Sequence, residues 1–189
     1  MNRNFCKLFS ILLLISGLFS CENDLKEVQL LTQKPKLLPT ETAKGVDMIY
    51  SDSGKATARL TAPLLLHYTI GVKEPYEELP KGIYVEFYDA SNKVKSILKA
   101  NYAIRNEQTK KMEAKYKVEV ISENGDKLNT EHLIWDEEKR KIISDEFVKI
   151  TTQKEIITGE GLIAEQDFSE WEILKVKGVI KVDEKEITK

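Results

Sequence analysis

The 189-residue sequence is poor in the residue types that most metal and thiol sites need. It contains two cysteines and two histidines, and His67 and His132 have no third ligand at a metal-binding spacing. The 29 basic and 31 acidic residues give a formal net charge of −2, so there is no basic excess for binding a nucleic-acid backbone. Nine glycines and five prolines exclude collagen-like and low-complexity chains. The apolar fraction of 41% is too high for a wholly disordered chain and too low for a protein with several membrane spans.

Two short motifs resemble catalytic or cofactor-binding patterns but lack their context. Ser96 and Lys99 have the spacing of a serine–lysine nucleophile pair, yet residues i and i+3 of an alternating strand point to opposite faces. Gly159 and Gly161 lack the third glycine and the strand–turn–helix setting of a dinucleotide site. The basic run 139–141 is typical of a surface turn, with contact to anionic glycolipid headgroups as the alternative. We therefore expect no catalysis, no cofactor and no metal site.

The N-terminus has the features of a secretory signal. Arg3 and Lys7 begin a segment whose apolar run, residues 8–19, is shorter than the about 20 residues of a membrane-spanning helix. The run ends in Leu18-Phe19-Ser20-Cys21, which resembles a bacterial lipoprotein signal, in which the cysteine is acylated and becomes the first mature residue. We expect a signal peptide at 1–20 and lipidation of Cys21. The alternative is a short uncleaved anchor with a chance cysteine.

The segments that flank the main domain are polar. Residues 21–44 contain Pro35 and Pro39 and no convincing strand alternation, which predicts a flexible tether after the lipidated cysteine. The leucines of this tether could instead fold back onto the domain. Residues 183–189 are expected to form a charged C-terminal tail. Because Cys21 would be the single cysteine of the mature chain, no intramolecular disulfide is expected.

Residues 45–182 are expected to form an all-β domain. Valine, isoleucine, threonine and aromatic residues alternate with charged residues, and turn-forming clusters lie at 52–54, 90–92, 123–126 and 136–138. Asn124-Gly125 is the strongest hairpin signal, because both residues tolerate positive φ. No long stretch has an apolar stripe of helical period. Residues 109–116 have the propensity for a short helical turn, but their setting between strands argues against one.

One segment recurs along this domain. Residues 98–120 align on residues 128–150 without a gap, and shorter copies begin at 60 and 157. Within each copy the inward phase slips by one residue, which predicts a bulge or corner that keeps side chains facing inward. The copies therefore predict an elongated, twisted, partly open β-jellyroll built from repeated strand units. One column of small residues would leave space for close sheet packing or for a ligand: Ala62, Ala100, Thr130 and Gly159.

The repeated pattern resembles the LptC family. It is carried by Leu128-x-Thr130-x-x-Leu133-x-Trp135-Asp136, the basic turn, Ile142 to Ile150, and Gly159-x-Gly161-Leu162. The resemblance covers about residues 45–182 and implies a twisted β-jellyroll, shared with LptA, in the lipopolysaccharide export machine. The lipoprotein-like signal, in place of the transmembrane helix of many members, indicates a lipoprotein-type member of the family.

This resemblance implies a membrane-anchored periplasmic adaptor. It would relay lipopolysaccharide from the inner-membrane ABC transporter to an LptA-like bridge protein, and its edge strands would pair with these partners. We expect the protein in the periplasm, held at the inner membrane by its N-terminal lipid, with no nucleic-acid partner. The alternatives are another envelope β-roll lipoprotein with a structural or lipoprotein-sorting role, and an envelope hydrolase.

The candidate lipid-binding residues are those that the strand phase places inside the roll, with a closed and fully packed core as the alternative. They are Leu60, Ala62, Leu65, Val85, Phe87, Leu98, Ala100, Val118, Val120, Leu128, Thr130, Leu133, Trp135, Val148, Ile150, Ile157 and Leu162.

The lipoprotein signal predicts the result of changing its cysteine. Cys21→Ala should abolish labelling with radioactive palmitate and leave an uncleaved precursor, because acylation and cleavage both require the cysteine. Labelling in cells, read together with the mass of the protein, checks this. A mutant of normal mature mass that still fractionates with membranes would contradict it.

Overall fold

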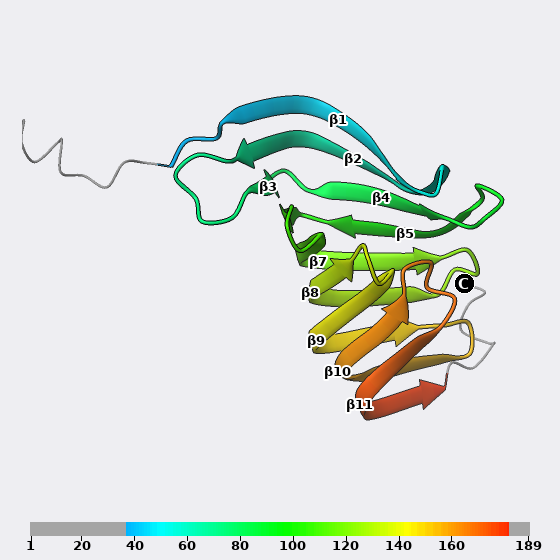
Figure 1. The fold of residues 1–189 in the computed structure, drawn as a ribbon. Helices are drawn as coiled ribbons and strands as arrows, with labels where there is room; N and C mark the ends of the chain where they lie inside the picture. Colours follow the sequence, from blue (N-terminus) through cyan, green and yellow to red (C-terminus); the bar gives the residue numbers. More distant parts are fainter. Residues whose placement is uncertain (1–36, 182–189) are drawn as a thin grey trace, which may run out of the picture. The chain divides into compact units, whose positions relative to one another are not determined.

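The computed structural model describes residues 37–181, so Cys21, the predicted signal peptide and the predicted tail lie outside the described residues. These residues form eleven strands (Figure 1). The strands are β1 (Glu41–Asp52), β2 (Lys55–Tyr68), β3 (Tyr76–Leu79), β4 (Ile83–Tyr88), β5 (Val94–Ala100), β6 (Tyr102–Asn106), β7 (Lys111–Ser122), β8 (Lys127–Asp136), β9 (Lys141–Thr151), β10 (Glu155–Glu165) and β11 (Trp171–Lys181). The predicted all-β class is confirmed.

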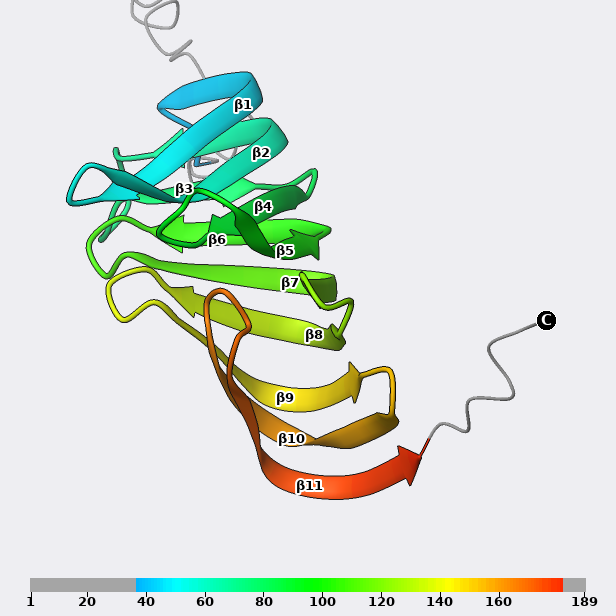
Figure 2. The same cartoon turned by 90° about the vertical axis from the view of Figure 1, so that its right-hand side faces the viewer.

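The strands form one antiparallel sheet that is folded into two walls. One half of β2 pairs with β4 and the other half with β3, and the two halves of β7 pair with β5 and β6 in the same way. The first wall therefore contains β4 and β5, and the second contains β3 and β6. The long strands cross from one wall to the other and lie one below another from β7 to β11 (Figure 2).

A corner joins the two walls at the predicted phase slip. In β7, Tyr116 and Lys117 have φ values of 65° and 53°, and the register with β8 shifts at this point. Asn101 alone separates β5 from β6, and Gly161 in β10 has a φ of 77°. The buried residues on either side of the corner are Ala62 and Leu65, Ala100 and Ala103, Thr130 and Leu133, and Gly159 and Leu162 in the four copies.

Two buried hydroxyl groups bind the carbonyl groups that the corner removes from the sheet. The β8–β9 ladder is interrupted over the corner. There the Thr130 hydroxyl donates to the backbone carbonyl of Phe147 at 2.9 Å, and the Ser144 hydroxyl donates to that of His132 at 2.7 Å. A buried carbonyl without a partner is costly, so these side chains stabilise the bend. The hydroxyl of Thr130, a candidate lipid-binding residue, is thus already used by the fold.

The repeat also holds at the level of its turns. Asn106 and Asp136, which the offset of 30 superimposes, each accept backbone N–H groups of the turn that follows. Lys110 and Arg140, another superimposed pair, both adopt positive φ, at 50° and 53°. The two copies that begin at 98 and 128 are therefore hairpins with the same turn chemistry, closed by an Asx-type side-chain acceptor.

One local expectation, the start of the first strand, needs correction. The first strand begins at Glu41 and not at Gly45, because residues 41–44 pair with residues 64–67 of β2. Their charged, exposed side chains hide a strand at the edge of the sheet from a periodicity argument. The segment 109–116 forms the turn into β7 and the start of that strand, as its setting between strands indicates, because residues 111–115 pair with β6 and β8. The hairpin predicted at Asn124-Gly125 is confirmed, since residues 123–126 join the antiparallel strands β7 and β8, and Gly125 has positive φ. Leu38, one of the leucines of the predicted tether, is exposed.

The corner hydrogen bond predicts that the stability of the fold depends on a hydroxyl group at position 130. Thr130→Val, which keeps the shape, should reduce the free energy of unfolding by about 1–3 kcal/mol, because the Phe147 carbonyl loses its donor. Urea unfolding followed by intrinsic fluorescence measures this change.

Thr130→Ser is the matched control, since serine retains the hydroxyl and loses a methyl group. The valine variant could be as stable as wild type while the serine variant has a lower free energy of unfolding. In that case the packing of the methyl group, and not the hydrogen bond, would explain the threonine at position 130.

Candidate functional site

An unbroken row of inward apolar residues crosses the first wall from one edge of the sheet to the other. Each member pairs in register with the next. The row is Met48, Leu60, Val85, Leu98, Val120, Leu128, Ile150, Ile157 and Val179. It joins nine strands, which at ~4.8 Å between neighbours makes a row of about 38 Å.

The row is buried in its middle and reaches solvent at its ends. The members from β2 to β9 are 0–2% exposed. Met48 at one edge and Ile157 near the other are partly buried, and Val179 is 54% exposed. All of the candidate lipid-binding residues are buried except Ile157, which is partly buried. The candidates therefore lie inside the roll, as the phase predicts, and most belong to one packed cluster.

The column of small residues serves close packing at one position. A Cβ atom on Gly159 would lie 2.4 Å from Cγ2 of Ile173, which is buried. Ile173 of β11 thus occupies the space that the missing side chain leaves. Of the two expected uses of the small column, the structure shows close sheet packing at Gly159.

Trp135 is buried between the two walls. Its ring makes edge-on contacts with Phe87 of the first wall and with Tyr50, at centroid distances of 4.9 Å and 5.2 Å. Its indole N–H donates to the side-chain carbonyl of Gln166 at 3.2 Å. Edge-to-face aromatic pairs add to the apolar burial, so Trp135 holds the two walls together.

The side of the roll opposite the corner, where the free margins of the two walls meet, is here called the seam. Arg140 of the β8–β9 turn forms an ion pair with Asp52 of β1 across the seam. The Arg105 guanidinium, 5.6 Å from the Tyr50 ring centroid, also binds Glu137 at 2.6 Å and Glu77 at 3.3 Å. Burial raises the pKa of Tyr50, so its hydroxyl stays neutral. Aromatic and charged contacts thus close the seam near β1.

The loop of residues 166–170, between β10 and β11, closes the seam further along. Ser96 of β5 donates its hydroxyl to the Gln166 carbonyl at 3.0 Å, and the Gln166 N–H donates to the Arg140 carbonyl. Phe168 of this loop is buried and stacks on Trp171. No sequence pattern indicates that Gln166 and Phe168 close the seam, because a loop flanked by acidic residues carries no periodic signal.

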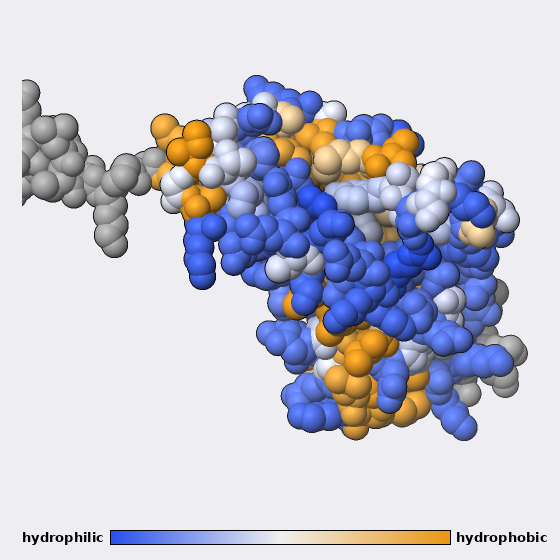
Figure 3. All heavy atoms as spheres, viewed as in Figure 1, coloured by the Kyte–Doolittle hydropathy of each residue, from blue (hydrophilic) through white to orange (hydrophobic). Residues whose placement is uncertain are grey.

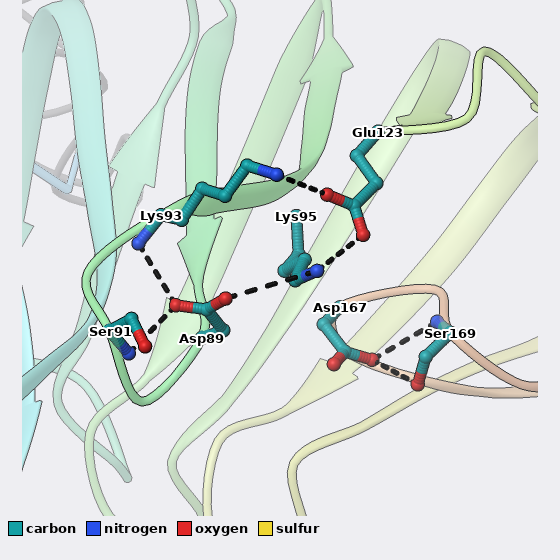
Figure 4. A network of polar contacts seen from close by, with 7 residues as sticks. All are labelled: Asp89, Ser91, Lys93, Lys95, Glu123, Asp167 and Ser169. Atoms are coloured by element: carbon teal, nitrogen blue, oxygen red, sulfur yellow. Dashed lines mark hydrogen bonds and ion pairs between the residues drawn. The ribbon is translucent and has the colours of Figure 1, made fainter.

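A polar network lies beside this loop (Figure 4). Lys95 binds Glu123 and lies 3.8 Å from Asp89, while Lys93 also reaches Glu123 at 3.2 Å. Asp167 of the loop lies beside Lys95 (Figure 4). Hydrogen bonds from the two lysines hold the pKa of Glu123 below its usual value of 4.5, and backbone N–H groups lower that of Asp89. The rim of the seam is therefore charged, while the interior is apolar.

The two edges of the sheet have only one strand partner each. β1 pairs with β2 and β11 pairs with β10, so the outer backbone groups of both strands are free among the described residues. The surface over β10 and β11 is rich in apolar atoms (Figure 3). Its exposed large apolar residues are Ile163, Leu174, Val176, Val179 and Ile180.

The residues considered for other chemistry are not assembled into a site. Ser96 is buried and Lys99 is exposed, so the two side chains point to opposite sides of the sheet, as expected. His67 and His132 are partly buried beside Glu107 and Glu113, at 2.5 Å and 3.5 Å, rather than packed in the core. No cluster of potential metal ligands is present within residues 37–181, and no helix in this range could span a membrane.

A bent, repeated antiparallel roll with an apolar interior and two free edges is the architecture that the sequence resemblance implied. The family model described as "Lipopolysaccharide-assembly, LptC-related" matches residues 9–181 of the chain. The chain belongs to the LptC family. A comparison with curated proteins found no match.

Membership in the LptC family defines the general role of the protein. It takes part in lipopolysaccharide transport, in a family whose members are not enzymes and act in the periplasm in association with the inner membrane.

The charged rim predicts an acid-sensitive contribution to stability. The pKa of Glu123 is lower in the folded protein than in the unfolded chain. The ionised carboxylate therefore stabilises the fold above about pH 4.5, and this stabilisation is lost as the pH falls through the pKa of the folded state. Glu123→Gln should therefore melt at a lower temperature than wild type at pH 7, and this difference should shrink at acidic pH.

Calorimetry at a series of pH values measures both melting temperatures. Lys154→Met, a change of an exposed turn lysine, is the control and should show the acid dependence of wild type. A constant difference between Glu123→Gln and wild type across the series would exclude this role of the carboxylate.

Proposed function

We propose that this LptC family member is a lipid-anchored periplasmic adaptor that relays lipopolysaccharide through its apolar interior. It would receive lipopolysaccharide from the inner-membrane ABC transporter and pass it to an LptA-like bridge protein. The observation that carries this proposal is the continuous inward row from Met48 to Val179, which is buried in the middle and reaches solvent at both edges.

The length and chemistry of this row fit a fatty acyl chain. One leaflet of a bilayer has about 15 Å of hydrocarbon, half of the ~30 Å core, so the row of about 38 Å exceeds the length of such a chain. The row presents only aliphatic side chains, while lysine and glutamate residues point to the outside of the same strands. Acyl chains would lie against the row while sugars and phosphates stay in water.

Entry of a chain requires the walls to part, since the residues between them form one packed cluster. Parting exposes apolar surface at a cost of ~25 cal/mol per Å², and each methylene group that takes its place contributes about 0.8 kcal/mol. Contacts between the walls would thus be exchanged for contacts between wall and chain. Per unit of apolar area, the free-energy cost of parting the walls is similar to the free-energy gain from binding the chain. This balance is suitable for a relay that must both accept and release its cargo.

The free edges provide the attachment points for the partners. β1 and β11 each present one unpaired row of backbone N–H and C=O groups, and an edge of this kind can pair with the edge strand of a similar roll. Rolls joined at both edges would place their inward rows end to end. The transported lipid would then move along one continuous apolar surface.

The proposed anchor is the acylated Cys21, which would hold the protein at the inner membrane. Residues 22–40 would then connect the lipid to β1, a span of at most about 65 Å when extended at ~3.4 Å per residue. An anchor of this kind keeps the roll near the transporter without a membrane-spanning helix.

Photo-crosslinking at the ends of the row tests the proposal. A photoreactive benzoylphenylalanine in place of Met48 or of Val179 should form adducts with lipopolysaccharide in cells, because both positions face inward. The neighbouring positions Ile49 and Ile180 are 67% and 63% exposed and apolar, but face outward, so they are matched controls that should give few adducts.

Adducts are scored by immunoblotting for lipopolysaccharide on the purified protein. Equal labelling at inward and outward positions would indicate unspecific contact with lipid, and no labelling at Met48 or Val179 would refute the relay.

A further inference from the structure

The loop between β10 and β11, residues 166–170, is not placed as an ordinary turn. It extends beside β8 toward β7, along the seam (Figure 2). The turn that follows β8, residues 137–140, is composed of four charged residues and contains no buried side chain. The 166–170 loop instead buries Gln166 and Phe168, which are 8% and 3% exposed. Its side chains enter the roll where the two walls meet.

Gln166 binds both walls at once. Its backbone carbonyl accepts the hydroxyl of Ser96, which lies on β5 of the first wall. Its side-chain carbonyl accepts the indole N–H of Trp135, and its N–H donates to the carbonyl of Arg140, both from the part of the chain that forms the second wall. A single loop residue therefore clasps the seam through three hydrogen bonds. The walls cannot separate here unless these bonds break.

Phe168 fills apolar space beneath this clasp. Its ring stacks on Trp171 at a centroid distance of 6.4 Å and belongs to the same cluster as the inward residues. Its φ of 57° is unfavourable for an aromatic residue. The burial of the Phe168 ring therefore compensates for a local backbone strain. The residues next to it, Asp167 and Ser169, are polar and close a small turn through the Asp167 carboxylate. An apolar side chain thus projects inward from a loop that is otherwise polar.

The contacts of Gln166 and Phe168 indicate which chemical groups a ligand needs in order to replace the loop. A ligand that takes the place of Phe168 must supply apolar contacts to Trp171 and the interior, which a fatty acyl chain does. The groups that Gln166 releases, the Ser96 hydroxyl and the Trp135 indole N–H, would face the seam, where water and sugar hydroxyl groups can bind them. The charged rim around Lys95 would stay outside the apolar space.

We infer that the 166–170 loop is a displaceable plug: Phe168 occupies the entry site of an acyl chain, and the Gln166 clasp holds the seam closed until the chain displaces it. This inference rests on the proposed function, because it concerns how lipid enters the same interior. It assigns an entry site on the seam, between the two ends of the row.

A reversible disulfide tests the plug in the full-length lipidated protein, in which Cys21 is expected to be acylated. Ser96→Cys combined with Gln166→Cys is designed to join the loop to β5 when oxidised, because the Ser96 hydroxyl contacts the backbone of residue 166, and the loss of both free thiols verifies the bond. With the photoreactive residue at Val179, the oxidised protein should form at least tenfold fewer lipid adducts than the reduced protein. The reduced protein should equal or exceed wild type, because the clasp is weakened. The adducts are analysed separately for lipopolysaccharide and phospholipid, and a loss of either supports the plug and identifies the source of the chain.

Asn129→Cys combined with Lys149→Cys is the matched control, since these residues pair on the outer face of β8 and β9 and do not bridge the seam. Oxidation of this pair should leave the adducts unchanged. Equal labelling of the seam pair in both redox states would overturn the plug alone. Absence of adducts in the reduced protein and in wild type would overturn the proposed function, and the plug with it.

Hydrogen exchange gives a second readout that needs no substitution. The Gln166 amide is bonded to the Arg140 carbonyl and should exchange at least tenfold faster when purified wild-type protein is mixed with lipopolysaccharide. Unchanged exchange at a lipopolysaccharide concentration that gives adducts would show that the loop stays in place and would contradict the plug.

Discussion

A strand that bends gives up ladder hydrogen bonds at the bend, and this constraint governs the architecture. The long strands cross the corner between the two walls, where positive φ residues, a strand break or a register shift accommodate the turn. The lost bonds are replaced by the hydroxyl groups of Thr130 and Ser144, which are buried for this reason. Because the corner recurs with each repeat, the sheet folds onto itself and keeps an apolar row on the inside of one wall.

The bend brings together two walls that would otherwise expose their apolar faces, and the seam determines how firmly they stay together. Trp135 contacts aromatic residues of the first wall, and Gln166 ties both walls through one loop. The interior is therefore packed in the free protein. A relay of lipid through this interior is an exchange of contacts, in which an acyl chain takes over the apolar surface that one wall offers to the other.

The sequence predicts the features that repeat and misses those that occur once. Alternation predicted the strands, the offset of 30 predicted the hairpins, and the phase slip between Thr130 and Leu133 predicted the corner, because each is a local pattern that several copies reinforce. The start of β1 at Glu41 was missed, since its first residues, 41–44, are all exposed and have no apolar period. Thr130 was selected for its small size, but its hydroxyl group has a structural partner that only the register reveals. The contact of Gln166 with Ser96 joins positions 70 residues apart, and no periodicity indicates it.

We expect the two walls to part when lipid is bound. The distance between two labels on opposite sides of the seam measures this directly. Spin labels at Ser53, in the β1–β2 turn, and at Lys139, in the β8–β9 turn, would lie near the Asp52–Arg140 ion pair that links these turns. Pulsed electron paramagnetic resonance then measures the distribution of distances between the labels with and without lipopolysaccharide. If the walls part, the distribution should shift to longer distances by several ångström in the presence of lipopolysaccharide. An unchanged, narrow distribution in samples that form lipopolysaccharide adducts would contradict it.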